Sequence, residues 1–245
     1  VLISFFCFFL LLPSLVLPGT KSRLNVHSYQ CMSTVKLIHS TNTGDNLIAY
    51  MARVSNPSNQ DNTETSEKLI RYLIKHRHWS PFEMVNMCVE IGTTRSISAQ
   101  ILRHRSFSFQ EFSQRYAQIT DHPVVPALRR QDKTNRQNSI DDLDPFVIQD
   151  FQLDSQLLFD KAYLLYHKMI QSGVAKECAR EVLPLSIPTK MYMNGTLRSW
   201  IHYCELRCGV ETQLEHREIA DQCKKLICEQ FPLVSRALDW IVREK

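Results

Sequence analysis

The segment 80–91, SPFEMVNMCVEI, constrains the fold most, because its apolar side chains alternate with polar ones. They recur at every second position, at Val85, Met87, Val89 and Ile91. A period of two places all four on one face of an extended chain, which is typical of a half-buried β-strand. Since helical patterns come before and after this segment, the chain mixes strand with helix.

Two amphipathic helices are predicted before this strand. Residues 45–55 carry apolar side chains at helical spacing behind Asp45, which is the candidate N-terminal cap. After a polar loop, residues 65–76 repeat the pattern, with Thr65 or Ser66 as the cap.

The chain beyond the strand is predicted to be helical apart from one long loop. A helix over 95–105 comes first, and residues 118–145 then hold prolines, amides and mixed charge, which is typical of a surface loop. Helical patterns follow over five segments: 148–173, 176–183, 189–207, 212–231 and 233–242. Gly173 and Pro184 are the expected stops of the first two.

Length and composition predict one ordinary globular domain. The chain has 245 residues, of which 44% are hydrophobic and 22% charged, and its formal net charge is +4. That charge is too mild for a histone-like or ribosomal protein, so any anion binding should be local. Eight cysteines are scattered without a C-x-x-C pair, which indicates reduced thiols rather than a disulfide framework.

The first 31 residues differ from the rest in composition. Residues 1–19 are apolar and uncharged, about as long as the hydrophobic region of a signal peptide and short for a membrane span. Residues 20–40 are basic and rich in Ser and Thr, as organelle transit peptides are. We expect 1–31 to be a targeting segment, or sequence upstream of a start at Met32, and 32–245 to be one domain without stable membrane insertion. The expected compartment is the cytoplasm, or a plastid or mitochondrion if the segment is a targeting signal.

The segment 103–116, RHRSFSFQEFSQRY, concentrates positive charge in this mildly charged chain. Arg103, His104 and Arg105 can be cations in the last turn of a helix, facing the negative end of its dipole. The polar run that follows, interleaved with phenylalanines, favours a different interpretation. Arginine binds phosphate with two hydrogen bonds, while amide and hydroxyl groups recognise the edges of a heterocyclic base. We therefore expect an anionic ligand that carries phosphate and a base.

Three other interpretations fit these residues less well. A single-stranded nucleic acid needs basic residues along a continuous groove, whereas here they cluster in motifs, so no nucleic acid polymer is predicted as a partner. Ser113 lacks the Ser-His-Asp order or G-x-S-x-G turn that activates a serine nucleophile. His76 and His78 suggest zinc, but the sequence there continues a helix and shows no closing ligands, so no metal is predicted.

The charged segment resembles the signature of the flavin-dependent thymidylate synthases, in which R-H-R is followed after seven residues by Ser. Further motifs of that family occur in the same order: ARVS at 52–55, HWSPFE at 78–83, AREVLPLS at 179–186 and LRSWIHYCELR at 197–207. The resemblance runs from about residue 35 to the end of the chain. One departure is Met84, which stands where many relatives have histidine.

This resemblance implies both a fold and a reaction. The fold is α/β (α+β), with a central, mostly antiparallel sheet flanked by helices, in a homotetramer whose active sites lie at subunit junctions. The reaction is the conversion of dUMP to dTMP with 5,10-methylenetetrahydrofolate, FAD and NADPH. A non-catalytic homologue acting as an assembly partner is the remaining alternative, and the intact set of motif arginines argues against it.

The resemblance also assigns residues to the two principal ligands. The implied FAD-binding residues are His78, Ser80, Arg103, His104, Arg105, Glu111 and, from another subunit, Thr196, Leu197, Arg198 and His202. The implied dUMP-binding residues are Gln100, Arg103, Glu111, Ser113, Gln114, Arg115, Arg180 and Arg207.

Three of these arginines have specific expected roles. Arg115 and Arg180 are expected to neutralise the dUMP phosphate, although Arg180 can equally pair with Glu177 or Glu181 on its own helix. Arg207 is the catalytic candidate, because a guanidinium beside uracil N3 and O4 favours the electron-rich, enolate-like base. In this family no cysteine attacks the base.

Overall fold

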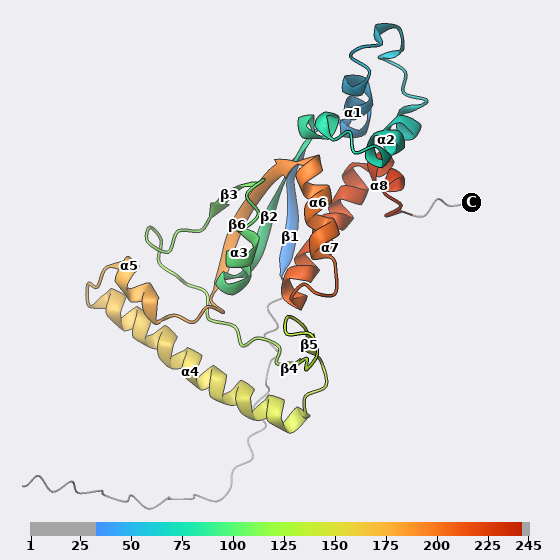
Figure 1. Ribbon diagram of the computed structural model, residues 1–245. Helices are drawn as coiled ribbons and strands as arrows, with labels where there is room; N and C mark the ends of the chain where they lie inside the picture. Colours follow the sequence, from blue (N-terminus) through green and yellow to red (C-terminus); the bar gives the residue numbers. More distant parts are fainter. Residues whose placement is uncertain (1–32, 242–245) are drawn as a thin grey trace, which may run out of the picture.

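The computed structural model describes residues 33–241, so the expected segment 1–31 lies outside the described residues. Its centre is a four-stranded sheet in the order β1-β2-β6-β3 (Figure 1). The strands are β1 (Thr34–Ser40), β2 (Asn86–Thr94), β3 (Ser108–Glu111) and β6 (Pro188–Thr196). Every neighbouring pair is antiparallel, which confirms the expected sheet.

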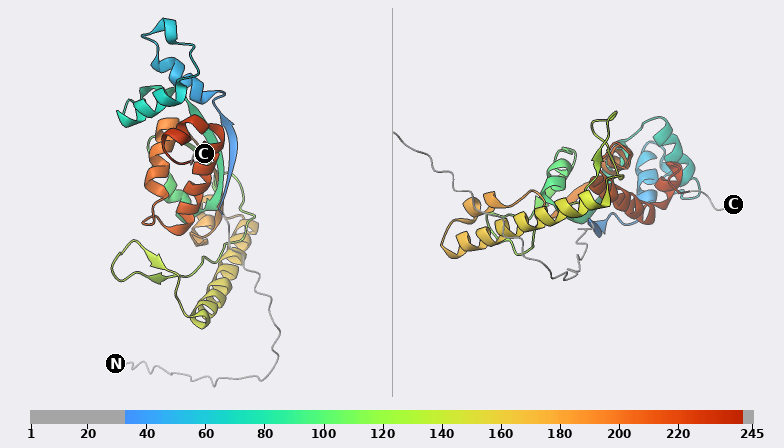
Figure 2. Two further views of the ribbon diagram at one scale, coloured as in Figure 1. Left: turned by 90° about the vertical axis from the view of Figure 1, so that its right-hand side faces the viewer. Right: turned by 90° about the horizontal axis from the view of Figure 1, so that it is seen from below.

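Helices α3 (Arg95–Ile101), α6 (Leu197–Arg207) and α7 (Leu214–Gln230) share one core with the sheet. Figure 2 shows α6 and α7 on one side of β1 and β2. Alternate residues of the two central strands, Met87 and Val89 on β2 and Met191 and Met193 on β6, are fully buried. The Trp200 indole on α6 donates a hydrogen bond to the Met87 carbonyl at 2.9 Å, which ties that helix to the sheet.

The prediction for residues 189–207 is wrong in its first half. These residues are not one helix, because Pro188–Thr196 form β6 and only Leu197–Arg207 form α6. Met191 and Met193 alternate with exposed residues and point into the core, which is the period of a strand. Strand β1, which no sequence pattern indicated, pairs with β2 at the edge of the sheet.

A small helical group packs at one end of the sheet (Figure 1). It contains α1 (Gly44–Ala52), α2 (Ser66–Lys75), α8 (Pro232–Ala237) and the short 3-10 turns η1 (Pro57–Asn59) and η2 (Ser80–Met84). The helices predicted within 45–55 and 65–76 are therefore confirmed, whereas that predicted over 233–242 ends at Ala237, where the chain turns.

The cap assignments for the first two helices are wrong. The Asp45 carboxylate lies inside α1 and accepts hydrogen bonds from the backbone N–H groups of Leu233 and Val234, at 2.8 and 3.1 Å. It thus caps α8, which begins 187 residues later by number, rather than its own helix. Thr65 precedes α2 without a side-chain cap and instead accepts a hydrogen bond from Arg53.

The other end of the sheet leads to a long helix. This is α4 (Pro145–Gln171), followed by α5 (Lys176–Ala179) and the turn η3 (Arg180–Val182). Of the 27 residues of α4 only Tyr166 is buried. No helix among residues 33–241 combines the length and apolar character needed to cross a bilayer.

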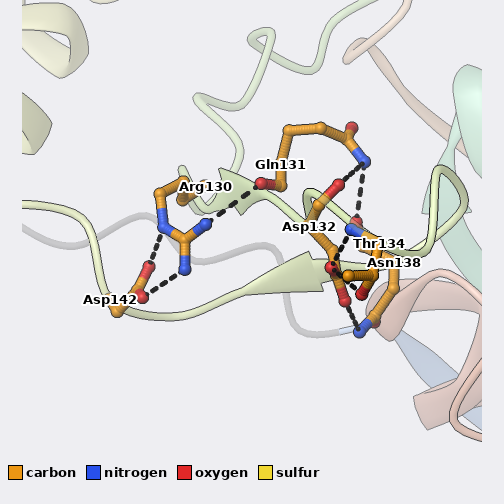
Figure 3. A network of polar contacts seen from close by, with 6 residues as sticks. All are labelled: Arg130, Gln131, Asp132, Thr134, Asn138 and Asp142. Carbon is orange, nitrogen blue, oxygen red and sulfur yellow. Dashed lines mark hydrogen bonds and ion pairs between the residues drawn. The ribbon is translucent and has the colours of Figure 1, made fainter.

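The predicted surface loop 118–145 is confirmed apart from a small hairpin. Its strands are β4 (Arg130–Gln131) and β5 (Ser139–Ile140). Figure 3 shows the polar contacts that hold it: Arg130 pairs with Asp142, and the Asp132 carboxylate accepts hydrogen bonds from Thr134 and Asn138. These hydrogen bonds hold the pKa of Asp132 well below its usual range.

Candidate functional site

Arg103, His104 and Arg105 follow the C-terminal end of α3, where the chain turns toward β3. The turn is fixed by Phe107, whose ring is buried against Trp200 with 4.8 Å between centroids. Phe107 also lies over Gly195 of β6, where an added Cβ would be 2.7 Å from the ring atom Cε1. The glycine therefore permits the close approach that positions the basic triplet.

Arg207, the last residue of α6, contacts the middle residue of this triplet. Its Nε donates a hydrogen bond to His104 Nε2 at 2.9 Å. Because Nε2 accepts, the His104 ring is neutral and carries its proton on Nδ1. Burial, then the charges of Arg207 and His202, lower the pKa of His104 to about 4, in agreement with a neutral ring.

Three guanidinium groups at this place lack a carboxylate partner. Arg103 and Arg105 are exposed and Arg207 is half-buried, and none forms an ion pair with any residue between 33 and 241. An uncompensated cluster of cations attracts an anion, and planar guanidinium groups suit phosphate and carbonyl oxygens.

Glu111, at the end of β3, is held by residues that sequence reasoning missed. Its Oε1 lies 2.7 Å from Arg95 Nη1 and accepts hydrogen bonds from the hydroxyls of Ser98 (2.8 Å) and Thr189 (3.1 Å). All three contacts go to Oε1, so Oε2 can accept a hydrogen bond from a ligand. The partners come from α3 and β6, and no local sequence signal links them to Glu111.

Gln100 of α3 is joined to α7 and α6 by further polar contacts that sequence reasoning missed. Its amide contacts Gln213 and His216, and His216 in turn contacts the Tyr203 hydroxyl. These contacts connect Gln100, a predicted nucleotide-binding residue, with α6, the helix that carries Arg207.

The predicted phosphate-binding arginines lie on two neighbouring segments. Arg115 pairs with Glu177 at 3.1 Å, and Arg180 pairs with Glu181 at 3.3 Å. The second ion pair is the alternative role that the sequence allows Arg180 besides phosphate binding. Lys176 Nζ reaches the Tyr116 carbonyl at 3.0 Å, which holds the 113–116 segment against α5. A phosphate bound here has to replace these carboxylates.

Ser113 and Gln114 directly precede Arg115 in the sequence. Ser113 is exposed, whereas Gln114 is 7% exposed and its Nε2 has no hydrogen-bond partner among the described residues. An unpaired buried amide is rare in proteins, and it is satisfied when a ligand or partner supplies an acceptor.

Most of the remaining predicted FAD residues gather at the opposite end of α6 from Arg207. Exposed His78 and Ser80 lie at the turn η2, whose Glu83 pairs with Arg198. The Thr196 hydroxyl caps α6 by accepting from the Ser199 N–H at 3.3 Å. Leu197 and Arg207 are the first and last residues of α6, about 15 Å apart along its axis, whereas His202 lies near the middle of the helix, close enough to His104 for its charge to lower the pKa of that ring.

Two residues of that second group differ in exposure. His202 is exposed and available to a ligand. Leu197 is fully buried, and its N–H donates to the Val85 carbonyl at 2.7 Å, so its side chain belongs to the core.

The histidines first considered for zinc lie beyond α2, since that helix ends at Lys75 and Arg77 adopts a left-handed φ of 57°. The assumption that a helix continues through them is wrong. Across the described part of the chain, no group of three or more His, Cys, Asp or Glu side chains is placed to hold a metal ion.

Comparison with known proteins agrees with the motifs. Residues 36–233 match the family described as "Thymidylate synthase complementing protein". The probable flavin-dependent thymidylate synthase of Paramecium bursaria Chlorella virus 1 is 48% identical over 208 residues, which cover 85% of this chain and 96% of the relative. The flavin-dependent thymidylate synthase of Synechocystis sp. is 51% identical over 196 residues, or 80% and 90% of the two chains. The chain belongs to the flavin-dependent thymidylate synthase family.

A solved structure shows the same fold as this family member. It is the UMP/dUMP methylase PolB from Streptomyces cacaoi bound with 5-Br dUMP, 27% identical, with a TM-score of 0.76 over 85% of this chain and 95% of that one. Family membership confirms the expected flavoenzyme, a methyltransferase that uses FAD. The residues present fit an anionic dinucleotide, because the cations beside His104 are uncompensated and Gln114 Nε2 lacks an acceptor.

Proposed function

We propose that this protein methylates C5 of dUMP to give dTMP, with 5,10-methylenetetrahydrofolate as one-carbon donor and NADPH as reductant. The observation that carries the proposal is the uncompensated set of Arg103, Arg105 and Arg207 around a neutral His104. The names of the relatives and the 5-Br dUMP bound by PolB support the nucleotide. The reaction balances as dUMP, methylenetetrahydrofolate, NADPH and a proton giving dTMP, tetrahydrofolate and NADP⁺.

Arg207 supplies the charge stabilisation that this reaction needs. When bound and reduced by NADPH, FAD would supply the hydride that reduces the transferred one-carbon unit. Uracil has to become electron-rich at C5, and a guanidinium fork near N3 and O4 stabilises that negative charge. The hydrogen bond to His104 orients the Arg207 fork before the substrate arrives, and the remaining N–H groups can face the base.

Arg115 and Arg180 bind the phosphate in this proposal. A charge-assisted hydrogen bond stabilises a complex by roughly 1.5–3 kcal/mol, more than an exposed arginine–glutamate pair contributes. The dUMP phosphate can therefore displace Glu177 and Glu181, whose pairs with these arginines are largely exposed. Ser113 and Glu111 Oε2 offer a donor and an acceptor next to them.

Two cysteines on the helices beside the site are unsuited to act as thiolate nucleophiles. Cys204, on α6, and Cys223, on α7, are both buried. Hydrogen bonding to Cys208 and burial raise the pKa of Cys204, and burial raises that of Cys223, so both remain neutral thiols. A neutral buried thiol is a poor nucleophile.

We also propose a homotetramer in which another subunit completes each FAD site. Within one subunit Thr196 and Arg198 lie at the N-terminal end of α6, whereas His104 contacts Arg207 at its C-terminal end. Helix α4 offers the surface for such assembly, because a stripe of apolar side chains on it is exposed at every turn or two: Phe146, Leu153, Leu157 and Leu164. Positions 0, 7, 11 and 18 along a helix lie on one line of its surface.

The proposed compartment is the cytoplasm, or a plastid or mitochondrion if residues 1–31 act as a targeting segment. Import of a fusion of residues 1–45 to a fluorescent protein into isolated organelles would decide between them.

The activity is tested directly with the purified protein. With FAD, NADPH, methylenetetrahydrofolate and dUMP present, dTMP should accumulate, and omission of any one should stop it. UMP is added in a parallel assay as the competing nucleotide, because PolB is described as a UMP/dUMP methylase. A flavin-loaded, folded protein that forms no dTMP under saturating conditions would overturn the proposal.

A further inference from the structure

His216, in the first turn of α7, is a fully buried histidine with polar contacts at both ring nitrogens. Its Nε2 lies 3.1 Å from the Tyr203 hydroxyl of α6, and its Nδ1 lies 3.3 Å from Gln100 Oε1 of α3. The three residues thus join the helices that carry Gln100 and Arg207. An apolar residue would fill the same space without the cost of burying an imidazole.

The chemistry of these groups fixes where the protons lie. Burial raises the pKa of the Tyr203 phenol well above its usual value, so its hydroxyl keeps its proton and donates it to His216 Nε2. Burial and the nearby Arg207 charge lower the pKa of His216 to about 3, so the ring is neutral. A neutral ring that accepts at Nε2 carries its hydrogen on Nδ1, and that hydrogen is donated to Gln100 Oε1.

The nitrogen of the Gln100 amide also has a hydrogen-bond partner. Gln100 Nε2 donates to Gln213 Oε1 at 2.7 Å, and Gln213 Nε2 donates to Glu215 Oε2 at 2.9 Å. Glu215 is anchored by Arg129 of the hairpin at 2.8 Å. Since Oε1 faces His216 and Nε2 faces Gln213, the amide cannot flip without losing both hydrogen bonds. One N–H and one lone pair remain unused on Gln100, which is only partly buried.

We propose that His216 is a positioning residue for substrate recognition, holding the Gln100 amide with its free N–H and free lone pair toward the pyrimidine nucleotide. This rests on the proposed function, in which Gln100 contacts dUMP. A free donor beside a free acceptor matches a ligand group that both accepts and donates, such as the imide edge of uracil or a sugar hydroxyl. Tyr203 contributes indirectly: its hydroxyl donates to His216 Nε2 and so keeps the ring hydrogen on Nδ1.

Two replacements of His216 by an amide side chain distinguish a role in orienting Gln100 from a role in filling the core. The side-chain amide of His216→Asn reaches about as far as Nδ1 and keeps a donor for Gln100, whereas that of His216→Gln reaches toward Nε2 and serves Tyr203 only. Flavin-loaded protein is titrated with dUMP by calorimetry, and KM and kcat for dUMP are measured beside flavin content and Tm. Tyr166→Phe is the matched control, because Tyr166 is equally buried and its hydroxyl accepts from the Ile119 N–H at 3.0 Å, in a core cluster separate from that of Tyr203.

We expect His216→Gln and His216→Leu to raise the dUMP dissociation constant and KM roughly tenfold, the loss of about one hydrogen bond, with flavin content unchanged. His216→Asn should restore most of the affinity for dUMP, and Tyr203→Phe should raise the dUMP dissociation constant by less than tenfold.

Equal affinity for dUMP in the Asn and Gln variants, or wild-type affinity in the Leu variant, would overturn the positioning role. If the wild-type protein itself fails to bind dUMP, the proposed function is what fails. If His216→Leu does not fold, the Asn and Gln pair together with Tyr203→Phe still decides the question.

Discussion

Arg207 and His104 lie 103 positions apart in the sequence, and a 2.9 Å hydrogen bond from Nε to Nε2 joins them. The bond makes each residue dependent on the other. Burial and the neighbouring Arg207, which donates to its acceptor nitrogen, keep His104 neutral. The Arg207 fork is oriented because one of its N–H groups is already bound. A cation without a carboxylate partner is thereby fixed in the candidate site, as the proposed charge stabilisation by Arg207 requires.

Replacing Arg207 with Lys tests this arrangement. Lysine keeps a positive charge near the C-terminal end of α6 but loses the planar fork and the Nε–H that His104 accepts. We expect Arg207→Lys to fold and hold FAD, yet to form dTMP at least roughly 100-fold more slowly with all cosubstrates saturating, as is typical when one preorganised donor is lost. The control is Arg136→Lys, in the exposed hairpin loop. Near-normal turnover would leave Arg207 only a stabilising role at the helix end.

The two neutral histidines predict how stability depends on pH. The pKa of His104 is about 4 and that of His216 about 3, whereas both titrate near 6.5 in the unfolded chain. Between those values and pH 6.5 the unfolded chain binds more protons at these sites, so stability falls as pH is lowered through that window. Each histidine contributes a slope of at most about 1.4 kcal/mol per pH unit. Urea unfolding at several pH values should therefore show a shallower fall for His216→Asn than for wild type, and parallel curves would contradict this.

Gly195 and Phe107 predict a coupled effect on the core and on the basic triplet. In Gly195→Ala the new methyl group meets the Phe107 ring, so the ring and the 103–105 segment have to shift. We expect a loss of about 1–3 kcal/mol in unfolding free energy and weaker FAD retention. Gly209→Ala is the matched control, since its new Cβ would have 3.8 Å to the nearest atom. Adding Phe107→Leu should recover part of the loss, and simple additivity of the two changes would argue against the contact.

Much of this architecture could be predicted because its signals are local. The helices α2, α4 and α7 show apolar side chains at helical spacing, and the alternation that predicts β2 runs from Val85, just before the strand, to Ile91 within it. β6 carries the same alternation at Met191 and Met193, but it runs without a turn into the helical pattern of α6, which concealed the boundary. β1 alternates only weakly and lies beside a segment of transit-like composition.

The site itself was only partly accessible from the sequence. Motif spacing indicated the arginines and Gln100, because these residues lie in contiguous runs that resemble a known family. The residues that hold them, such as Ser98, Thr189 and His216, contact their partners across 13 to 116 positions. Such pairs depend on how strands and helices pack, and no local pattern encodes them.

Asp45 predicts a stability effect that leaves the chemistry intact. Its carboxylate accepts from two N–H groups at the start of α8, far along the chain from the candidate site. Asp45→Ala should lower the unfolding free energy by about 0.5–2 kcal/mol, as loss of a helix cap does, and Asp45→Asn should lower it less because one acceptor remains. Flavin content and dUMP affinity of the folded protein should not change. Asp61→Ala, at an exposed position, is the control, and a loss as large as that of Asp45→Ala would refute the capping role.

The apolar stripe on α4 connects assembly with flavin binding. Leu164 is 67% exposed and Phe146 is 82% exposed within one subunit, and a charge on such a stripe is costly if another subunit covers it. We expect Leu164→Glu to shift the protein from tetramer to smaller species in light scattering and to lose FAD in parallel, because each FAD site then lacks the residues of its neighbour. Gln171→Glu adds the same charge at the exposed end of α4 and should leave both properties unchanged. A Leu164→Glu protein that stays tetrameric would exclude this stripe as the interface, whereas one that becomes monomeric yet retains full flavin would show that each subunit binds FAD alone.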